Sequence, residues 1–201
     1  MKHVFFAASL AFISAMSWAQ EWKPGTTDWQ MLPAVKQSKQ ALYLTPQQAY
    51  ELLQKSGKEI LFIDVRTRAE AMYVGMPGLA DALVPYVEHQ EIMADWDEKR
   101  SIYTLESNAD FASEVERRLL EKGLNKNSRI ILICRSGDRS ARAADLLGMR
   151  GFKNIYSIAE GFEGDMGKDG LSAGRRLVNG WKNANLPWSY KLEKAKMYFP
   201  Q

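Results

Sequence analysis

The sequence predicts an α/β domain built around a parallel sheet. Two short apolar runs, at residues 60–63 and 129–133, have the length of strands buried on both faces, and a third strand is expected at residues 154–158. Helix-like segments alternate with these runs, an order typical of a parallel sheet covered by helices. A shorter strand is expected at residues 82–84. Because ligands of such sheets bind beyond the carboxyl ends of the strands, the residues that follow each run are the first candidates for a functional site.

The expected helices are marked by capping residues and by apolar spacing. Thr45 and Gln48 form a capping-box pattern with a proline between them, so a helix is expected to begin there and to stop at Gly57. Residues 107–122 carry apolar side chains at four-residue spacing, which predicts an amphipathic helix. A further helix is expected over residues 139–149, directly after the second apolar run.

The start of the chain has the pattern of a secretory signal peptide over residues 1–19. Lys2 supplies a positive charge, an apolar stretch follows, and small residues precede a cleavage site after Ala19. The apolar stretch is shorter than the roughly 20 residues of a spanning helix, so we expect cleavage and no stable membrane insertion. In a Gram-negative bacterium the mature chain would then be periplasmic, in an oxidising compartment. We expect three further parts: an N-terminal extension at residues 20–42, the domain at residues 43–165, and a C-terminal extension at residues 166–201 packed on the domain.

The composition excludes several kinds of site. Cys134 is the single cysteine among 201 residues, which rules out an intramolecular disulfide and a zinc or iron–sulfur site built from several cysteines. No motif indicates a metal or an organic cofactor. The 27 basic and 24 acidic residues are too evenly balanced for an electrostatic nucleic-acid binder, so nucleic acid is not an expected partner. Any recognition of an anion must therefore be local.

A short loop joins the second apolar run to the helix after it, and its first residue is the cysteine. Such a loop can turn its backbone N–H groups toward the sulfur while the helix presents its positive end. Two arginines in the loop add positive charge, which favours a nucleophilic thiolate. A cysteine that merely fills the core is the alternative, but a filler requires neither the glycine nor the arginines. The segment reads Cys134, Arg135, Ser136, Gly137, Asp138, Arg139, Ser140.

This loop resembles the active-site loop of the rhodanese-like domain family, whose sulfurtransferases carry sulfane sulfur as a cysteine persulfide. Residues 61–66, which end in Asp64-Val65-Arg66, and Glu70 after them are similar to the family's first strand and its Asp-Val-Arg motif. Residues 75–85 are similar to a family turn and strand, although Met76 replaces the usual histidine. The resemblance covers about residues 43–165 and implies a three-layer domain with a central, mainly parallel five-stranded sheet flanked by helices.

The resemblance also implies an activity and a set of site residues. Cys134 would attack the outer sulfur of thiosulfate or a related anionic donor and pass that sulfur to a thiol, sulfite or cyanide, with no cofactor. Asp138 carries the wrong charge for an anion site, so we expect its carboxylate to point outward or to cap the helix. Asp64 and Arg66 either hold the loop by ion pairing, or Arg66 lies at the rim of the pocket. The expected substrate-binding residues are Arg135, Ser136, Gly137, Asp138, Arg139 and Arg66, and the expected supporting residues are Asp64 and Ser140.

Two other functions remain open. Tyrosine-type phosphatases place five residues between cysteine and arginine, whereas Arg139 follows Cys134 with four residues between them. This smaller loop disfavours phosphatase or arsenate reductase chemistry. A non-catalytic sulfur-delivery or docking module is the second alternative, and aromatic residues of the C-terminal extension could meet a periplasmic protein partner. We expect those rings to pack over the domain instead, and we expect His89 to lie at the surface rather than beside the cysteine.

Overall fold

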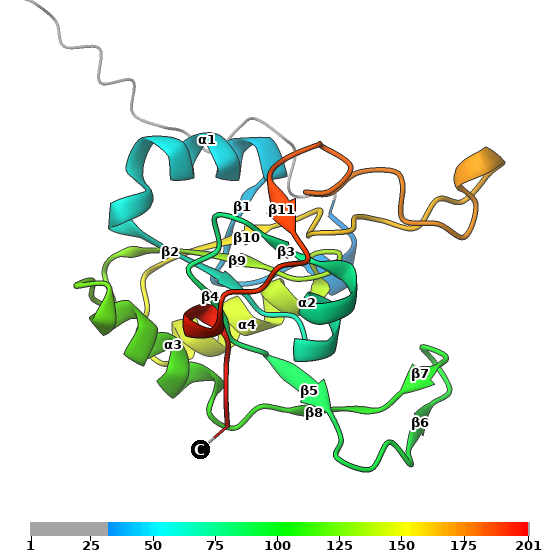
Figure 1. Ribbon diagram of the computed structural model, residues 1–201, viewed down its shortest axis with the longest axis horizontal. Helices are drawn as coiled ribbons and strands as arrows, with labels where there is room; N and C mark the ends of the chain where they lie inside the picture. The colour runs from blue at the N-terminus through cyan, green and yellow to red at the C-terminus, as the bar shows by residue number, and fades with distance from the viewer. Residues whose placement is uncertain (1–31, 201) are drawn as a thin grey trace, which may run out of the picture.

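Five parallel strands form the central sheet in the computed structural model, which describes residues 32–200 (Figure 1). The spatial order is β1-β10-β9-β2-β4, and all four neighbouring pairs are parallel. This arrangement confirms the predicted fold class. The expected signal peptide and most of the expected N-terminal extension lie outside the described residues. The strands are β1 (Leu42–Leu44), β2 (Ile60–Asp64), β4 (Ala82–Leu83), β9 (Arg129–Ile133) and β10 (Asn154–Ile158).

Helices cover both faces of the sheet, as the resemblance implied. The capping box is present, since the Gln48 amide donates to Thr45 Oγ1 at 3.2 Å and the Thr45 amide donates to Gln48 Oε1 at 2.9 Å. The α-helices are α1 (Pro46–Ser56), α2 (Arg68–Val74), α3 (Phe111–Glu121) and α4 (Asp138–Met149). Short 3-10 helices are η2 (Ala34–Lys36), η3 (Gly57–Glu59), η4 (Gly170–Ser172) and η5 (Lys194–Lys196). Within residues 32–200, no helix combines the length and apolar character needed to cross a bilayer.

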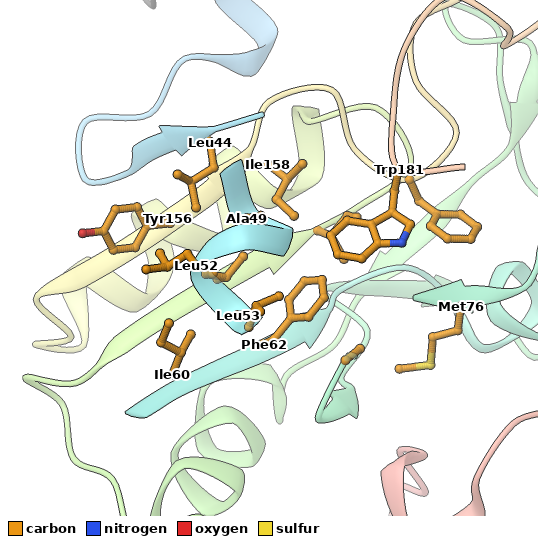
Figure 2. Packing of buried hydrophobic residues seen from close by; sticks show 14 of the residues in the cluster. Leu44, Ala49, Leu52, Leu53, Ile60, Phe62, Met76, Tyr156, Ile158 and Trp181 are labelled. Carbon is orange, nitrogen blue, oxygen red and sulfur yellow. The ribbon is translucent and has the colours of Figure 1, made fainter. Parts of the chain in front are cut away.

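Alternate residues of each strand point into two separate cores. In β2, Ile60 and Phe62 pack with α1 on one face (Figure 2), whereas Leu61 and Ile63 pack with α3 and α4 on the other face. Because both faces are covered, the strands are continuous apolar runs rather than alternating ones. This two-sided burial is the physical reason that the runs were recognisable in the sequence.

One expected helix boundary was wrong, and one strand was not predicted. The third helix begins at Phe111 rather than near residue 107, because β8 (Leu105–Ser107) pairs antiparallel with β5 (Val87–His89). The strand that was not predicted is β1. It is an edge strand of three residues, too short for a readable apolar period.

Residues 86–107 form an arm that was not predicted from the sequence. It contains the ribbon of β5 with β8 and a second ribbon, in which β6 (Trp96–Asp97) pairs antiparallel with β7 (Ile102–Tyr103). Figure 1 shows the arm extending away from the central sheet, on the side of α2. We call residues 86–107 the ribbon arm.

The C-terminal segment packs back on the sheet. Trp181 is fully buried, and its ring lies 5.5 Å from the Phe62 ring between centroids (Figure 2). Strand β11 (Trp188–Ser189) pairs antiparallel with β3 (Met76–Pro77). Met76, which replaces the family histidine, is 5% exposed and belongs to the core beside α1. Trp181 and Tyr198 are therefore buried and Trp188 packs against the core, whereas Tyr190 and Phe199 remain 60% and 59% exposed.

Candidate active site

The cysteine lies where the sheet meets the positive end of a helix. Strand β9 ends at Ile133, Cys134 follows, and α4 begins at Asp138. Gly137 turns the chain with a φ of +97°, and a Cβ atom on it would lie 2.1 Å from the carbonyl oxygen of Ala159. Only glycine fits this left-handed and crowded position. The geometry of the loop therefore requires a glycine at this position.

Three groups surround the sulfur atom. The backbone N–H of Gly137 donates to Cys134 Sγ at 3.1 Å, and Ser140 Oγ lies 3.5 Å from the same atom. The first turn of α4 adds the positive end of its dipole. We expected several loop amides to point at the sulfur, and the described contacts include one. Cys134 has no exposed surface, so the sulfur lies at the floor of the loop.

A second serine, which sequence reasoning missed, supports this arrangement. Ser157 of β10 is fully buried, and its Oγ donates to Ser140 Oγ at 2.8 Å. Ser140 in turn can donate to the carbonyl oxygen of Gly137 at 3.2 Å. The signal was a hydroxyl residue inside an otherwise apolar strand, since a buried polar group requires a partner.

Asp138 corrects an expectation. Its carboxylate does not point fully outward, and Gly137 rather than Asp138 occupies the N-cap position of α4. Instead, Oδ1 accepts from the Cys134 thiol at 3.8 Å, and Oδ2 accepts from Arg142 at 3.0 Å. Burial raises the pKa of Asp138, but the charges of Arg139 and Arg142 and the amides of the first helical turn outweigh it and lower that pKa. A negative charge therefore lies beside the sulfur.

Arg139 is engaged by an acidic residue from another element. Its Nη1 and Nη2 atoms each donate to the carboxylate of Glu70 in α2 at 2.6 Å. Burial by itself raises the pKa of Glu70, but the hydrogen bonds and charge of Arg139 dominate and lower it to about 2. The same partner holds the pKa of Arg139 above its usual range despite burial. Arg139 thus connects the loop to α2. Both of its terminal nitrogens are engaged by Glu70.

Arg66 lies inside the protein rather than at the rim of the pocket. Arg66 and Asp64 both have fully buried side chains, and their closest atoms lie 2.6 Å apart. The guanidinium also donates to the carbonyl oxygen of Gly75 at 2.6 Å and stacks 4.0 Å from the centre of the Phe162 ring. These three internal groups hold the guanidinium, and Arg66 does not line the cavity beside the cysteine loop. The expected substrate-binding role of Arg66 is therefore replaced by the structural one, as the alternative held.

The family profile of the rhodanese-like domain matches residues 45–167, which include four of the five strands of the sheet, the cysteine loop and the paired Asp64 and Arg66. The chain belongs to the rhodanese-like domain family. Membership in this family supports a sulfur-related function in general terms.

Several known proteins are similar to this chain over most of its length. An uncharacterized protein of Rickettsia conorii is 33% identical over 142 residues, which cover 71% of this chain and 92% of the relative. A tRNA uridine(34) hydroxylase of Corynebacterium glutamicum is 29% identical over 140 residues, which cover 68% of this chain and 38% of the hydroxylase. The crystal structure of Rv0390 from M. tuberculosis superposes with a TM-score of 0.57 and 27% identity, over 76% of this chain and 99% of that one. The superposition on Rv0390 agrees with the fold described above.

One loop cation of the rhodanese-like domain is left without an acidic partner. Arg135 makes no ion pair with any residue in the described range, and its Nε atom is buried without a hydrogen-bond partner. Ser136, the next residue, is half-buried, and its backbone approaches Gly161, where a Cβ atom would lie 2.5 Å from the Ser136 nitrogen. Of the two expected arginines, Arg135 rather than Arg139 is therefore free to meet an anion.

A cavity of about 600 Å³ opens between the cysteine loop and the ribbon arm. His89 belongs to its lining, is half-buried, and has a buried Nδ1 atom without a partner, so it is not the surface residue that we expected. Between residues 32 and 200, no group of three or more histidine, cysteine or acidic side chains is arranged to hold a metal ion. The residues from the loop that line the cavity are Arg135, Asp138, Arg139 and Arg142.

Proposed function

We propose that the protein is a sulfurtransferase that moves sulfane sulfur from thiosulfate or a related donor to a thiophilic acceptor. The carrier would be a persulfide on Cys134. The observation that carries the proposal is the placement of Sγ at the beginning of α4, where it accepts a hydrogen bond from the Gly137 N–H at 3.1 Å. A backbone N–H and a helix N-terminus both stabilise negative charge on sulfur. The same groups would stabilise the outer sulfur atom of a bound persulfide.

The chemistry requires two displacements at sulfur. In the first, thiolate Cys134 attacks the outer sulfur of thiosulfate, the sulfur–sulfur bond of the donor breaks, and sulfite leaves with the bonding electrons. In the second, an acceptor such as a thiol, sulfite or cyanide attacks the outer sulfur of the persulfide, and Cys134 leaves as a thiolate. Arg135 is the loop cation free to attract the anionic donor, because Arg139 is paired with Glu70.

Phosphatase chemistry fits this site less well. A phosphoryl group would require a loop arginine to face its oxygens. Tyrosine-type phosphatases place this arginine six positions after the cysteine, where this chain has Ser140. The neighbouring Arg139 donates to Glu70 through both of its terminal nitrogens. A non-catalytic docking module is also less well supported, because it would require neither Gly137 nor the contact between Gly137 and Sγ.

We further propose that the protein acts after export, with residues 1–19 removed. The proposal rests on the sequence pattern of the leader. Edman sequencing or mass spectrometry of protein from the periplasmic fraction of a Gram-negative host tests it. A mature chain that begins at Gln20 is expected, and retention of residues 1–19 in the cytoplasm would contradict the proposal.

Intact-protein mass spectrometry tests the activity directly. The mature protein is measured before and after incubation with thiosulfate, beside Cys134→Ser. We expect a gain of about 32 Da, one sulfur atom, on the wild type alone, as covalent catalysis requires. A gain on Cys134→Ser, or none on the wild type with several sulfane donors, would contradict the proposed function.

A further inference from the structure

The cavity beside the cysteine loop has two chemically different walls. The ribbon arm contributes an apolar wall that includes Val87, Trp96 and Tyr103, and the loop and α4 contribute a wall of arginines. Its volume of about 600 Å³ lies within the range of pockets that bind whole organic molecules. Thiosulfate is scarcely larger than sulfate, so it would leave most of this space unfilled.

The apolar wall is built from rings that the fold does not bury. Trp96 and Tyr103 are each 48% exposed, and their rings meet edge to face with centroids 5.3 Å apart. Neighbouring Ile102 is partly buried and lines the same cavity. Exposed aromatic residues that gather in a concave site are typical of ligand pockets, since the ligand covers the apolar surface.

The arginines of the opposite wall differ in whether they are paired with an acidic residue. Arg139 is paired with Glu70, and Arg142 is paired with Asp138. Arg135 has no acidic partner among residues 32–200, and Arg100 of the ribbon arm approaches Asp97 only at 3.8 Å. The cavity therefore combines an aromatic surface with one cation that has no acidic partner among the described residues, Arg135, and a second, Arg100, whose ion pair with Asp97 is long.

We propose that this cavity binds the organic body of the sulfur acceptor, a small thiol that carries both an aromatic-sized apolar group and a carboxylate. The apolar group would lie against Trp96 and Tyr103, and the carboxylate would face Arg135 or Arg100. The acceptor thiolate would then attack the outer sulfur of the Cys134 persulfide. One sulfur–sulfur bond forms on the acceptor, the bond to Sγ breaks, and Cys134 leaves as a thiolate with no net oxidation. This inference rests on the proposed persulfide chemistry and adds the class of acceptor.

The test isolates the second half of the reaction. Protein loaded with sulfur from thiosulfate is mixed with mercaptoacetate, with α-mercaptophenylacetate, or with cyanide, and loss of the persulfide is followed by rapid quenching and mass spectrometry. The two thiols share a carboxylate and differ by a phenyl group. We expect the wild type to prefer the phenyl thiol by about 10-fold in second-order rate constant, as one ring contact allows.

Two variants change the apolar wall in opposite ways. Tyr103→Ala removes a ring, whereas Val87→Trp fills the cavity and leaves the Trp96–Tyr103 pair in place. Both are expected to abolish the preference for the phenyl thiol, measured relative to the cyanide rate of the same variant. Tyr73→Ala is the matched control, because Tyr73 is 74% exposed on α2 and does not line the cavity. It is expected to keep the preference.

The outcomes separate this inference from the proposed function. If the persulfide forms but the wild type shows no preference, or if Tyr73→Ala lowers it as much as Tyr103→Ala does, the cavity assignment is overturned and the persulfide chemistry stands. If no persulfide forms, the proposed function fails. Calorimetric binding of the two thiols to Cys134→Ser then still decides the cavity: tighter binding of the phenyl thiol supports it, and equal or absent binding overturns it.

Discussion

Arg139 of α4 and Glu70 of α2 form a two-pronged ion pair, with both hydrogen bonds 2.6 Å long. The pair joins the helix that begins at the cysteine loop to the helix that follows β2. Their side chains are 9% and 18% exposed, so water screens the interaction only weakly. An arginine that the sequence marks as a ligand for an anion therefore already holds an anion, the carboxylate of Glu70.

Glu70→Gln is expected to make stability depend less on pH. The pKa of Glu70 falls from the ordinary value of 4.5 to about 2 on folding, so its contribution is complete above pH 4.5 and is lost as the pH falls toward 2. At pH 7 the variant should lose about 3 kcal/mol of unfolding free energy. Urea denaturation at pH 7, 5, 4 and 3 checks this, and a difference that stays constant over that range would contradict it.

Asp138→Asn should speed the formation of the persulfide from thiosulfate. Oδ1 of Asp138 lies 3.8 Å from Sγ and carries a negative charge, which opposes both the thiolate and the doubly charged donor. Removal of one charge at this distance is expected to raise the rate by roughly 3- to 10-fold at low salt, with a smaller gain at high salt. Stopped-flow measurements beside Asp169→Asn, an exposed control, would reject the idea if both variants behaved alike.

Gly137→Ala should disable the cysteine loop. The added Cβ atom would lie 2.1 Å from the Ala159 carbonyl oxygen, so the loop and its N–H must move away from Sγ. We expect persulfide formation to fall by at least about 100-fold, a change of about 3 kcal/mol in activation free energy. Gly123→Ala is the matched control, since Gly123 also has a positive φ but nothing within 4 Å of its Cβ position. Equal losses in both variants would show that backbone strain alone is responsible.

Arg66→Ala is expected to reduce stability rather than donor affinity. The change leaves the fully buried Asp64 carboxylate without its ion-pair partner, which typically costs about 3–5 kcal/mol. Thermal unfolding and the KM for thiosulfate are measured on the same folded sample. A raised KM with an unchanged melting temperature would instead place Arg66 at the substrate.

Trp181→Ala tests the packing of the C-terminal segment. Trp181 is fully buried against Phe62, and its Nε1 donates to the Pro187 carbonyl oxygen at 2.9 Å. Its loss should cost about 3–5 kcal/mol of unfolding free energy. Tyr190→Ala, at a residue 60% exposed, should change stability by less than about 0.5 kcal/mol. Comparable effects in the two variants would mean that the segment is not part of the core.

Local patterns were sufficient for the main elements of the sheet domain. Buried strands appear as apolar runs because both faces of the sheet are covered, and α1 could be located because Thr45, Pro46 and Gln48 act within one helical turn. The cysteine loop was recognisable for the same reason, since Cys134 and Gly137 lie three residues apart and their contact is local. The ribbon arm was not recognisable, because its strands are two or three residues long.

The sequence by itself determined the parallel sheet, the cysteine loop at its edge and the family to which they point. Only the tertiary structure decided which charges in that site are free. Glu70 and Arg139 are 69 residues apart, and Ser157 and Ser140 are 17 apart, so each pair meets only when separate elements pack together. The spacing of residues along the sequence does not predict such long-range contacts. They follow from the order of β2, β9 and β10 in the sheet, which leaves Arg135 as the unpaired cation of the cysteine loop.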